Sequence, residues 1–423
     1  MWQKLSQIWK IKELRNSILY ILAMLVVFRF AAHIPIPGIN VENLREFFSS
    51  NQLLGLLNLF SGGGMENFSV VMMGVAPYIT ASIIFQLLAM IVPKLEEMNK
   101  DEAGRHKISS WTRWATVPLA ALQGYAMIQL LLRAPKPILE NLNLFTYITT
   151  LLTITAGTVF LMWIGELITE RKIGNGISLL IFAGIIVGIP KALQQIFINF
   201  SQDQLITLIV FAVVAVITVV GVVFISEGQR NIPVSYAKRI RGNRMYGGTN
   251  THLPLRVNQA GVIPIIFAIS VVLFPSMIAQ FMVQAKTEFI VSIGTWVTNL
   301  FQNNLFYGVL YFLLVFAFTY FYTAVIFHPS QIAENLQKSG AFIPGIRPGK
   351  QTEEYLQNTI SRITLTGALF LALIAILPLI LQNLFNMDSM VVGGTSILIV
   401  VAVVIEIVKQ IESQMEMREY DKL

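Results

Sequence analysis

The chain has 423 residues but no cysteine and few charged side chains. Without cysteine it cannot form disulfides, a thiolate nucleophile or a cysteine-ligated metal site. Charged residues make up 13% of the sequence, against about 25% in soluble domains, and the mean hydropathy is +0.66. The first apolar run, from Ile18, lacks a small-residue cleavage site, so we do not expect a cleaved signal peptide. Together these features predict a polytopic membrane protein.

Ionisable side chains inside the apolar runs are also scarce. Glu166 and Glu406 lie near predicted helix ends, and we expect both to be unpaired and structural. The four histidines show no metal-binding spacing, and the glycines at 340 and 345 lack the ending of a phosphate-binding loop. We therefore expect no catalytic residues, no metal and no cofactor, and hence no enzyme. A secondary transporter of a small solute, which would need a polar site within the membrane, is the alternative reading.

The apolar runs predict ten membrane-spanning helices. We expect them at residues 18–33, 75–92, 111–132, 149–168, 177–196, 205–225, 258–281, 305–327, 362–381 and 395–411. Of the 30 Lys and Arg residues, 24 lie in segments on the side of the N-terminus. By the positive-inside rule, the segments predicted to be cytoplasmic are residues 1–17, the long loops 226–257 and 328–359, and the tail 412–423.

The stretch from Leu53 to Val92 is too long and too interrupted for one spanning helix. Irregular backbone at membrane depth is tolerated only where protein or a water-filled cavity satisfies it. We therefore expect the first half of this stretch to be a small, mobile segment that lies in a cavity, with the glycines 62–64 as a flexible hinge.

A short internal repeat links two of the predicted helices. Gly74-Val-Ala-Pro77-Tyr-Ile79 matches Gly261-Val-Ile-Pro264-Ile-Ile266, and the two segments are five predicted crossings apart. Proline-interrupted segments at corresponding positions are typical of inverted repeats around a central site, although so short a match can arise by chance. The repeat favours two halves, residues 18–196 and 197–411.

The loop 226–257 carries six Lys and Arg residues and a single acid. Retention of the loop in the cytoplasm would alone explain this charge. Apolar residues alternate with the arginines, however, and long loops without helices are usually functional. We therefore prefer docking of a large acidic or nucleic-acid-containing partner.

Seven motifs, spread in order along the chain, resemble the SecY family, the pore-forming subunits of protein-conducting channels. They are HIPIPG at 33–38, PYITASIIFQLL at 77–88, GELITERKIGNGISLLIFAGI at 165–185, EGQRNIPVSYAKR at 227–239, THLPLRVNQAGVIP at 251–264, SGAFIPGIRPG at 339–349 and GGTS at 393–396. The resemblance implies an all-α fold of ten helices in two pseudo-symmetric inverted halves of five, with a re-entrant plug half-helix. It also implies a passive channel of the bacterial cytoplasmic membrane that passes unfolded preproteins across and releases membrane segments sideways.

The resemblance further assigns roles to individual residues. The implied pore ring consists of Ile79, Ile83, Ile177, Ile181, Ile266 and Ile399. The implied plug spans about residues 54–68 and contains Leu57, Phe60, Ser61, Gly62, Gly63, Gly64, Met65, Glu66, Asn67 and Phe68. The implied lateral gate contains Pro77, Ser82, Gln86, Pro264 and Phe267. A ring of apolar side chains can block ions by excluding water, while ordinary helix packing is the other explanation for six isoleucines.

The resemblance also implies partners. The implied partner-binding residues are Lys238, Arg239, Arg241, Arg244 and Arg347, in loops that would dock the SecA motor ATPase or the ribosome. The other implied partners are the membrane subunits SecE and SecG, a preprotein with its signal peptide, and the lipid bilayer. Asn243 stands where relatives often carry a basic residue, which leaves the charge pattern of its loop open.

Overall fold

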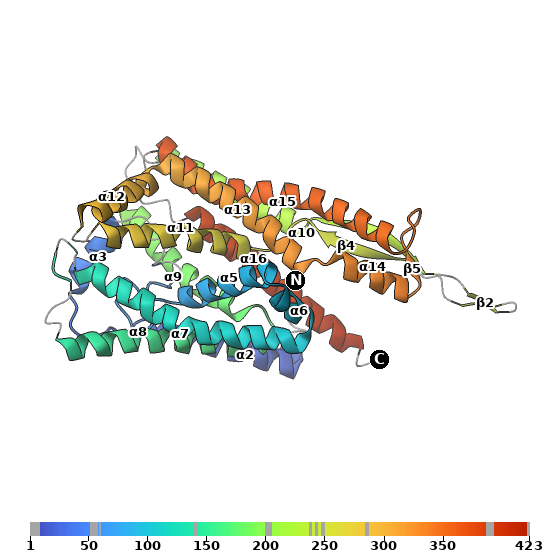
Figure 1. The fold of residues 1–423 in the computed structure, drawn as a ribbon, viewed down its shortest axis with the longest axis horizontal. Coiled ribbons are helices and arrows are strands. Elements are labelled where there is room, and N and C mark those ends of the chain that lie inside the picture. The colour runs from blue at the N-terminus through green and yellow to red at the C-terminus, as the bar shows by residue number, and fades with distance from the viewer. Residues whose placement is uncertain are drawn as a thin grey trace. The chain divides into compact units, whose positions relative to one another are not determined.

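The computed structural model describes residues 9–50, 58, 61–132, 134, 136–138, 143–198, 205–236, 239–241, 244–246, 250–283, 287–385 and 393–420. The chain divides into two compact units (Figure 1). Unit 1 comprises Met1–Leu208, Ser270–Gln302 and Val403–Leu423, and unit 2 comprises Ile209–Ile269 and Asn303–Ala402.

Unit 1 is built from helices. Those lying wholly within it are α2 (Lys12–Ala31), α3 (Val41–Ser50), α5 (Ala76–Ile91), α6 (Pro93–Lys100), α7 (Glu102–Leu132), α8 (Leu144–Thr169), α9 (Gly176–Ile198) and α12 (Glu288–Gln302). Helix α7 packs against α5, α6 and α8, and α8 also packs against α9. The chain bends by 105° between α5 and α6, where Pro93 prevents a continuous helix. Three further helices have residues in both units: α10 (Leu205–Glu227), α11 (Ile263–Met282) and α16 (Gly393–Tyr420).

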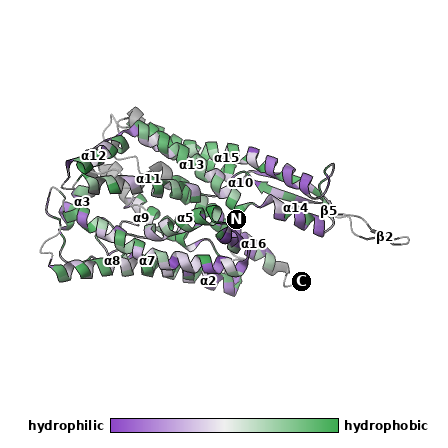
Figure 2. Ribbon diagram, in the orientation of Figure 1, coloured by the Kyte–Doolittle hydropathy of each residue, from purple (hydrophilic) through white to green (hydrophobic). Residues whose placement is uncertain are grey.

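Unit 2 combines two long helices with a small sheet. Helices α13 (Asn304–Ile326) and α15 (Lys350–Phe385) pack along each other. Figure 2 shows that the first turns of α15 are hydrophilic and that the rest of the helix is hydrophobic. The polar first turns of α15 therefore precede its apolar part, and α15 also packs against α14 (Pro329–Lys338).

The two long polar loops fold together into one structure. Strands β1 (Gln229–Tyr236), β4 (Asn250–Arg256) and β5 (Ala341–Phe342) form an antiparallel sheet in the order β4-β1-β5. A separate hairpin consists of β2 (Arg239–Arg241) and β3 (Arg244–Tyr246). We call the three-stranded sheet, α14 and the polar part of α15 the platform. Neither the strands of the first loop nor helix α14 of the second was predicted from the sequence.

The predicted spans agree with the helices in position but not always in length. Within the described residues, six helical segments are long and apolar enough to span a membrane, and the bent pair α5 and α6 would make a seventh. The remaining three predicted spans fall on α9, α11 and α16, so the count of ten stays a prediction. Helix α7 begins at Glu102 rather than 111, α15 begins at Lys350 rather than 362, and α16 continues to Tyr420. These extensions are polar, so a hydropathy criterion cannot find them.

Candidate functional site

Residues 61–75 of unit 1 form a run of hydrogen-bonded turns that leads into α5. The Ser61 hydroxyl donates to the carbonyl of Asn58 at 2.9 Å, and the Ser69 amide donates to the carbonyl of Gly64 at 2.9 Å. We call this run the turn segment. Its buried side chains are those of Ser61, Met65, Phe68, Ser69, Val71, Met72, Met73 and Val75. It is thus an irregular segment whose side chains pack like a core.

Helix α2 and the chain that follows it hold the turn segment. The Arg29 guanidinium donates to the carbonyl of Gly62 at 2.7 Å. Residues 34–36 exchange two backbone hydrogen bonds with residues 68–70, at 2.9 and 3.0 Å. Sequence reasoning missed Arg29, although a single arginine inside an apolar run is a recognised signal of function.

Two glycines allow the turn segment to approach neighbouring helices closely. A Cβ on Gly62 would lie 2.8 Å from Cζ of Phe28 in α2. A Cβ on Gly157, near the middle of α8, would lie 1.9 Å from the carbonyl oxygen of Val70. Backbone therefore touches backbone halfway along a membrane-spanning helix, at the depth where irregular structure must be enclosed by protein or water.

The structure places most of the predicted plug residues in this segment. Gly62 and Gly63 have φ values of +70° and +78°, which glycine adopts without strain, so their geometry is defined here, while mobility stays a prediction. The Glu66 amide donates to Asn58 Oδ1 at 3.1 Å, and Asn67 Oδ1 accepts from Arg45 at 3.4 Å. The described turns contain no half-helix. Leu57 and Phe60 lie outside the described residues.

The internal repeat has the same local geometry in both copies. Gly74 and Gly261 have φ values of +57° and +63°, and each lies two residues before the first residue of α5 or α11. Proline is the second residue of both helices, a position that tolerates the missing N–H. The amides of Ile79 and Ile266 donate to the carbonyls four residues earlier, at 3.1 and 3.3 Å. These two isoleucines therefore occupy equivalent positions in the first turns of their helices.

The six isoleucines of the implied pore ring are divided between the two units. Ile79, Ile83, Ile177 and Ile181 belong to α5 and α9 of unit 1, and Ile266 and Ile399 belong to unit 2. Five of them are buried and Ile177 is half-buried. Ile177 packs against Gly165 of α8, since a Cβ on that glycine would lie 2.6 Å from its Cδ1. The ring itself stays a prediction.

The implied gate residues lie on α5 and α11. Pro77 and Pro264 begin these helices and are buried. Gln86 donates to the Ser82 hydroxyl at 3.1 Å within α5, and its Oε1 is buried without a partner. Phe267 makes edge-on ring contacts with Phe318 and Tyr322 of α13, at 6.0 Å between centroids. Their role as a gate stays a prediction.

The platform has its own small apolar core in unit 2. The buried members are Ile232, Val234, Leu255, Ala341, Ile343, Leu356 and Ile360. They come from both long loops and from the polar part of α15. Because each strand is too short to be stable alone, the two loops depend on each other for their structure.

The described members of the implied partner-binding set lie on the β2–β3 hairpin and in one turn of unit 2. Arg239, Arg241 and Arg244 are strand residues of β2 and β3, and Lys238 lies outside the described residues. Arg347 is exposed, in the turn before α15. Its carbonyl accepts from the Thr352 hydroxyl at 2.9 Å. The backbone at this turn is therefore fixed while the guanidinium faces solvent.

Glu166 was expected to be unpaired, and this expectation was wrong. Arg113 Nε of α7 lies 3.0 Å from Glu166 Oε1 of α8. An ion pair between two helices does not need the periodic spacing by which sequence reasoning recognises a pair.

Just beyond Glu166, Lys172 and Gly174 have φ values of +57° and +90° in the turn between α8 and α9. The carbonyl of Lys172 accepts a hydrogen bond from the Gln414 side chain of α16, and the amide of Gly174 donates one to Gln410 Oε1. These two bonds hold α16 against the turn.

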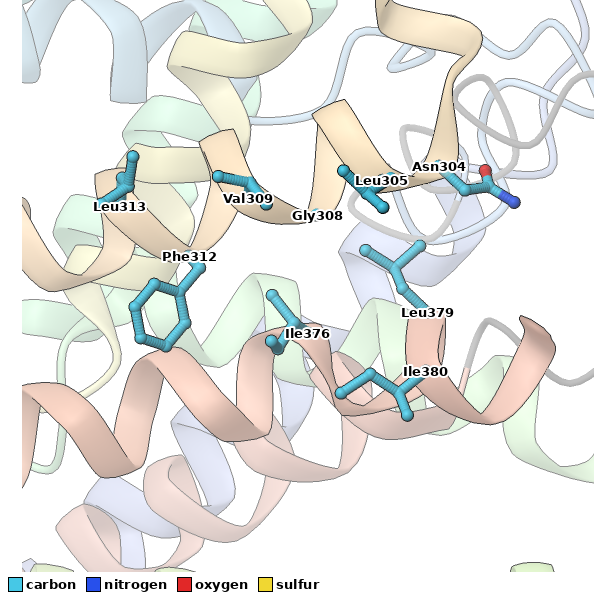
Figure 3. A pocket seen from close by; sticks show the side chains of 9 residues that line it. All are labelled: Asn304, Leu305, Gly308, Val309, Phe312, Leu313, Ile376, Leu379 and Ile380. Atoms are coloured by element: carbon cyan, nitrogen blue, oxygen red, sulfur yellow. The ribbon is translucent and has the colours of Figure 1, made fainter. Parts of the chain in front are cut away.

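The described residues offer no cluster of side chains for binding a metal ion. No three His, Asp or Glu side chains in the described part of the chain are close enough to hold a metal ion. A groove of about 440 Å³ runs between α13 and α15 (Figure 3). Its lining is apolar except for Asn304 at one end. Such a surface suits hydrocarbon and offers no charged ligand to a small polar solute.

Comparison with known proteins identifies the family. The SecY family model matches residues 69–408. The protein translocase subunit SecY of Halalkalibacterium halodurans is 42% identical over 431 residues, covering 99% of each chain. The fold resembles that of a SecY protein whose plug domain is described as stabilising the closed state of the translocation channel and maintaining a membrane seal. The TM-score is 0.63 at 17% identity, and the match covers 93% of this chain and 91% of that one.

A second solved structure is similar to the same extent. It is the idle yeast Ssh1 complex bound to the yeast ribosome, with a TM-score of 0.64, 13% identity, and coverage of 92% of this chain and 88% of that one. A family model that matches most of the chain, together with a relative that is similar over its whole length, leaves one conclusion. The chain belongs to the SecY family.

Proposed function

We propose that the chain is the channel subunit of a protein translocase. It passes unfolded polypeptides across a membrane and releases apolar segments sideways into the bilayer. The observation that supports this most strongly is the turn segment, an irregular piece of chain that packs against the middle of α8. A channel for a wide, variable substrate needs a stopper that can be displaced, whereas a solute transporter needs polar ligands at the same depth.

The implied ring fits the same function. Isoleucine side chains exclude water and offer no ligand to an ion, so a closed ring prevents leakage. A moving polypeptide meets only apolar groups there, which neither bind it through hydrogen bonds nor trap it by charge. The ring consists of Ile79, Ile83, Ile177, Ile181, Ile266 and Ile399, and the gate residues of α5 and α11 would separate to release segments into lipid.

The driving force comes from a partner, and the platform is its docking site. The hairpin β2–β3 and Arg347 extend from the platform core and carry positive charge, which attracts an acidic protein or ribosomal RNA. We assign these residues to binding of the ribosome or of the SecA motor. In this proposal SecE and SecG are membrane partners, and the termini lie in the cytoplasm of a bacterial cell whose cytoplasmic membrane holds the channel.

Reconstituted translocation tests the proposed function. Lipid vesicles containing the chain with SecE and SecG, supplied with SecA, ATP and a preprotein, should protect the preprotein from external protease. Vesicles without the chain should protect none. The Arg347→Glu variant should reduce protection while leaving the chain folded, because that side chain is exposed. Coupled uptake of a small solute without any protected preprotein would overturn the channel assignment.

A further inference from the structure

Helix α12, Glu288–Gln302, has three distinct surfaces along its length. One surface contains the buried Gly294, where a Cβ would lie 2.6 Å from the backbone nitrogen of Val283, just beyond the end of α11. A second surface is exposed and polar, with Ser292, Thr295 and Asn299. The third is exposed and apolar: Phe289 is 72% and Trp296 is 66% exposed.

The helical period separates these surfaces cleanly. Phe289 and Trp296 are seven residues apart, which places them on one face of a helix with 3.6 residues per turn. The half-buried Ile293 and Leu300 continue that face. Ser292 and Asn299, also seven residues apart, lie beside it on the side away from Gly294. A helix in water gains nothing from a row of exposed aromatic side chains next to a polar row.

The neighbouring elements fix α12 at a membrane surface. It follows α11, which ends at Met282, and it is separated from α13 only by Asn303. The Asn303 side chain accepts from the amides of Leu305 and Phe306, at 3.0 and 3.3 Å, so α13 begins immediately. Leu305, in the first turn of this spanning helix, is 75% exposed. The end of α12 therefore lies at the level where α13 enters the membrane.

We propose that α12 lies in the plane of the bilayer surface and inserts Phe289 and Trp296 among the lipids. Aromatic side chains favour this interfacial level, and an amphipathic helix there buries its apolar face at the boundary of headgroups and acyl chains. The polar row faces water. Gly294 lies against the chain at the end of α11, so lipid contact at α12 anchors this part of unit 1 to the bilayer surface.

The absence of cysteine makes this arrangement directly measurable. Four full-length single-cysteine variants, Phe289→Cys, Trp296→Cys, Ser292→Cys and Asn299→Cys, would be labelled with bimane in phosphatidylcholine vesicles. A doxyl group near the headgroup end of the acyl chain quenches labels at the lipid interface, and iodide quenches labels in water. All four positions are exposed, so the variants are expected to fold, and melting curves would verify it.

We expect lipid quenching at 289 and 296 to be about threefold stronger than at 292 and 299, with iodide quenching in the opposite order. Equal iodide quenching at all four positions would overturn the proposal, since the helix would then stand in water. Labels at 289 and 296 that neither quencher reaches would also overturn it, because a protein would then cover that face. Using two positions for each surface keeps the test valid if one variant fails to fold.

Discussion

Replacing Gly157 with alanine is expected to destabilise the protein by about 1–3 kcal/mol or more, as overpacking of a filled interior does. The new methyl group would lie 1.9 Å from the carbonyl oxygen of Val70. The oxygen belongs to the backbone, and the position of the methyl group is fixed by the backbone of α8, so neither can rotate away, and the turn segment and α8 must separate. Melting of the purified full-length chain, followed by tryptophan fluorescence, measures the effect.

The matched control for this variant is Gly308→Ala, in the second turn of the spanning helix α13. A Cβ at Gly308 meets nothing closer than Cδ1 of Leu379 at 3.7 Å, which is ordinary contact. Both variants reduce the freedom of the unfolded chain equally, so the difference between them reports the contact alone. Equal melting temperatures for the two variants would show that α8 and the turn segment do not touch.

Deleting residues 57–67 is expected to turn a silent channel into one that leaks small ions, with at least about a tenfold rise in conductance. The deletion removes the Gly62 carbonyl that Arg29 binds at 2.7 Å and the part of the turn segment in contact with Phe28. Current recorded across a planar bilayer containing the purified chain measures the change.

A graded variant separates loss of the stopper from general damage. Arg29→Met removes the hydrogen bond to Gly62 but leaves the turn segment in place, so we expect brief openings and a conductance between the two extremes. If the intact chain and the deletion are equally silent, the turn segment does not seal the channel. A large leak from the intact chain would contradict the seal as well.

The helices could be predicted from sequence because their signals are local. Apolar runs and the prolines at 77 and 264 gave the positions of α5 and α11, and the repeated Gly-Val-x-Pro predicted a shared start that the structure confirms. The platform could not be found in this way. Its β5 strand has two residues and pairs with β1, about a hundred residues earlier in the chain, and no periodicity within either loop records that pairing.

The site shows the same division between local and distant contacts. The glycines at 62–64 signal irregular backbone, but the contact of Gly62 with Phe28 depends on how distant segments pack. The ion pair between Arg113 and Glu166 likewise joins residues of different helices. Isoleucine is ordinary in apolar helices, so residue type alone carries no information on a pore ring, and only the family resemblance assigns the six positions.

The most direct test of the account is to find where a polypeptide runs during translocation. A preprotein with one cysteine, arrested in the reconstituted channel, would be oxidised together with chains carrying Ile79→Cys or Ile181→Cys. Leu122→Cys, 58% exposed on α7, is the control outside the implied pore. The account predicts disulfide-linked preprotein at 79 and 181, and none at 122. Protected preprotein without links at 79 or 181, or with equal links at 122, would contradict it.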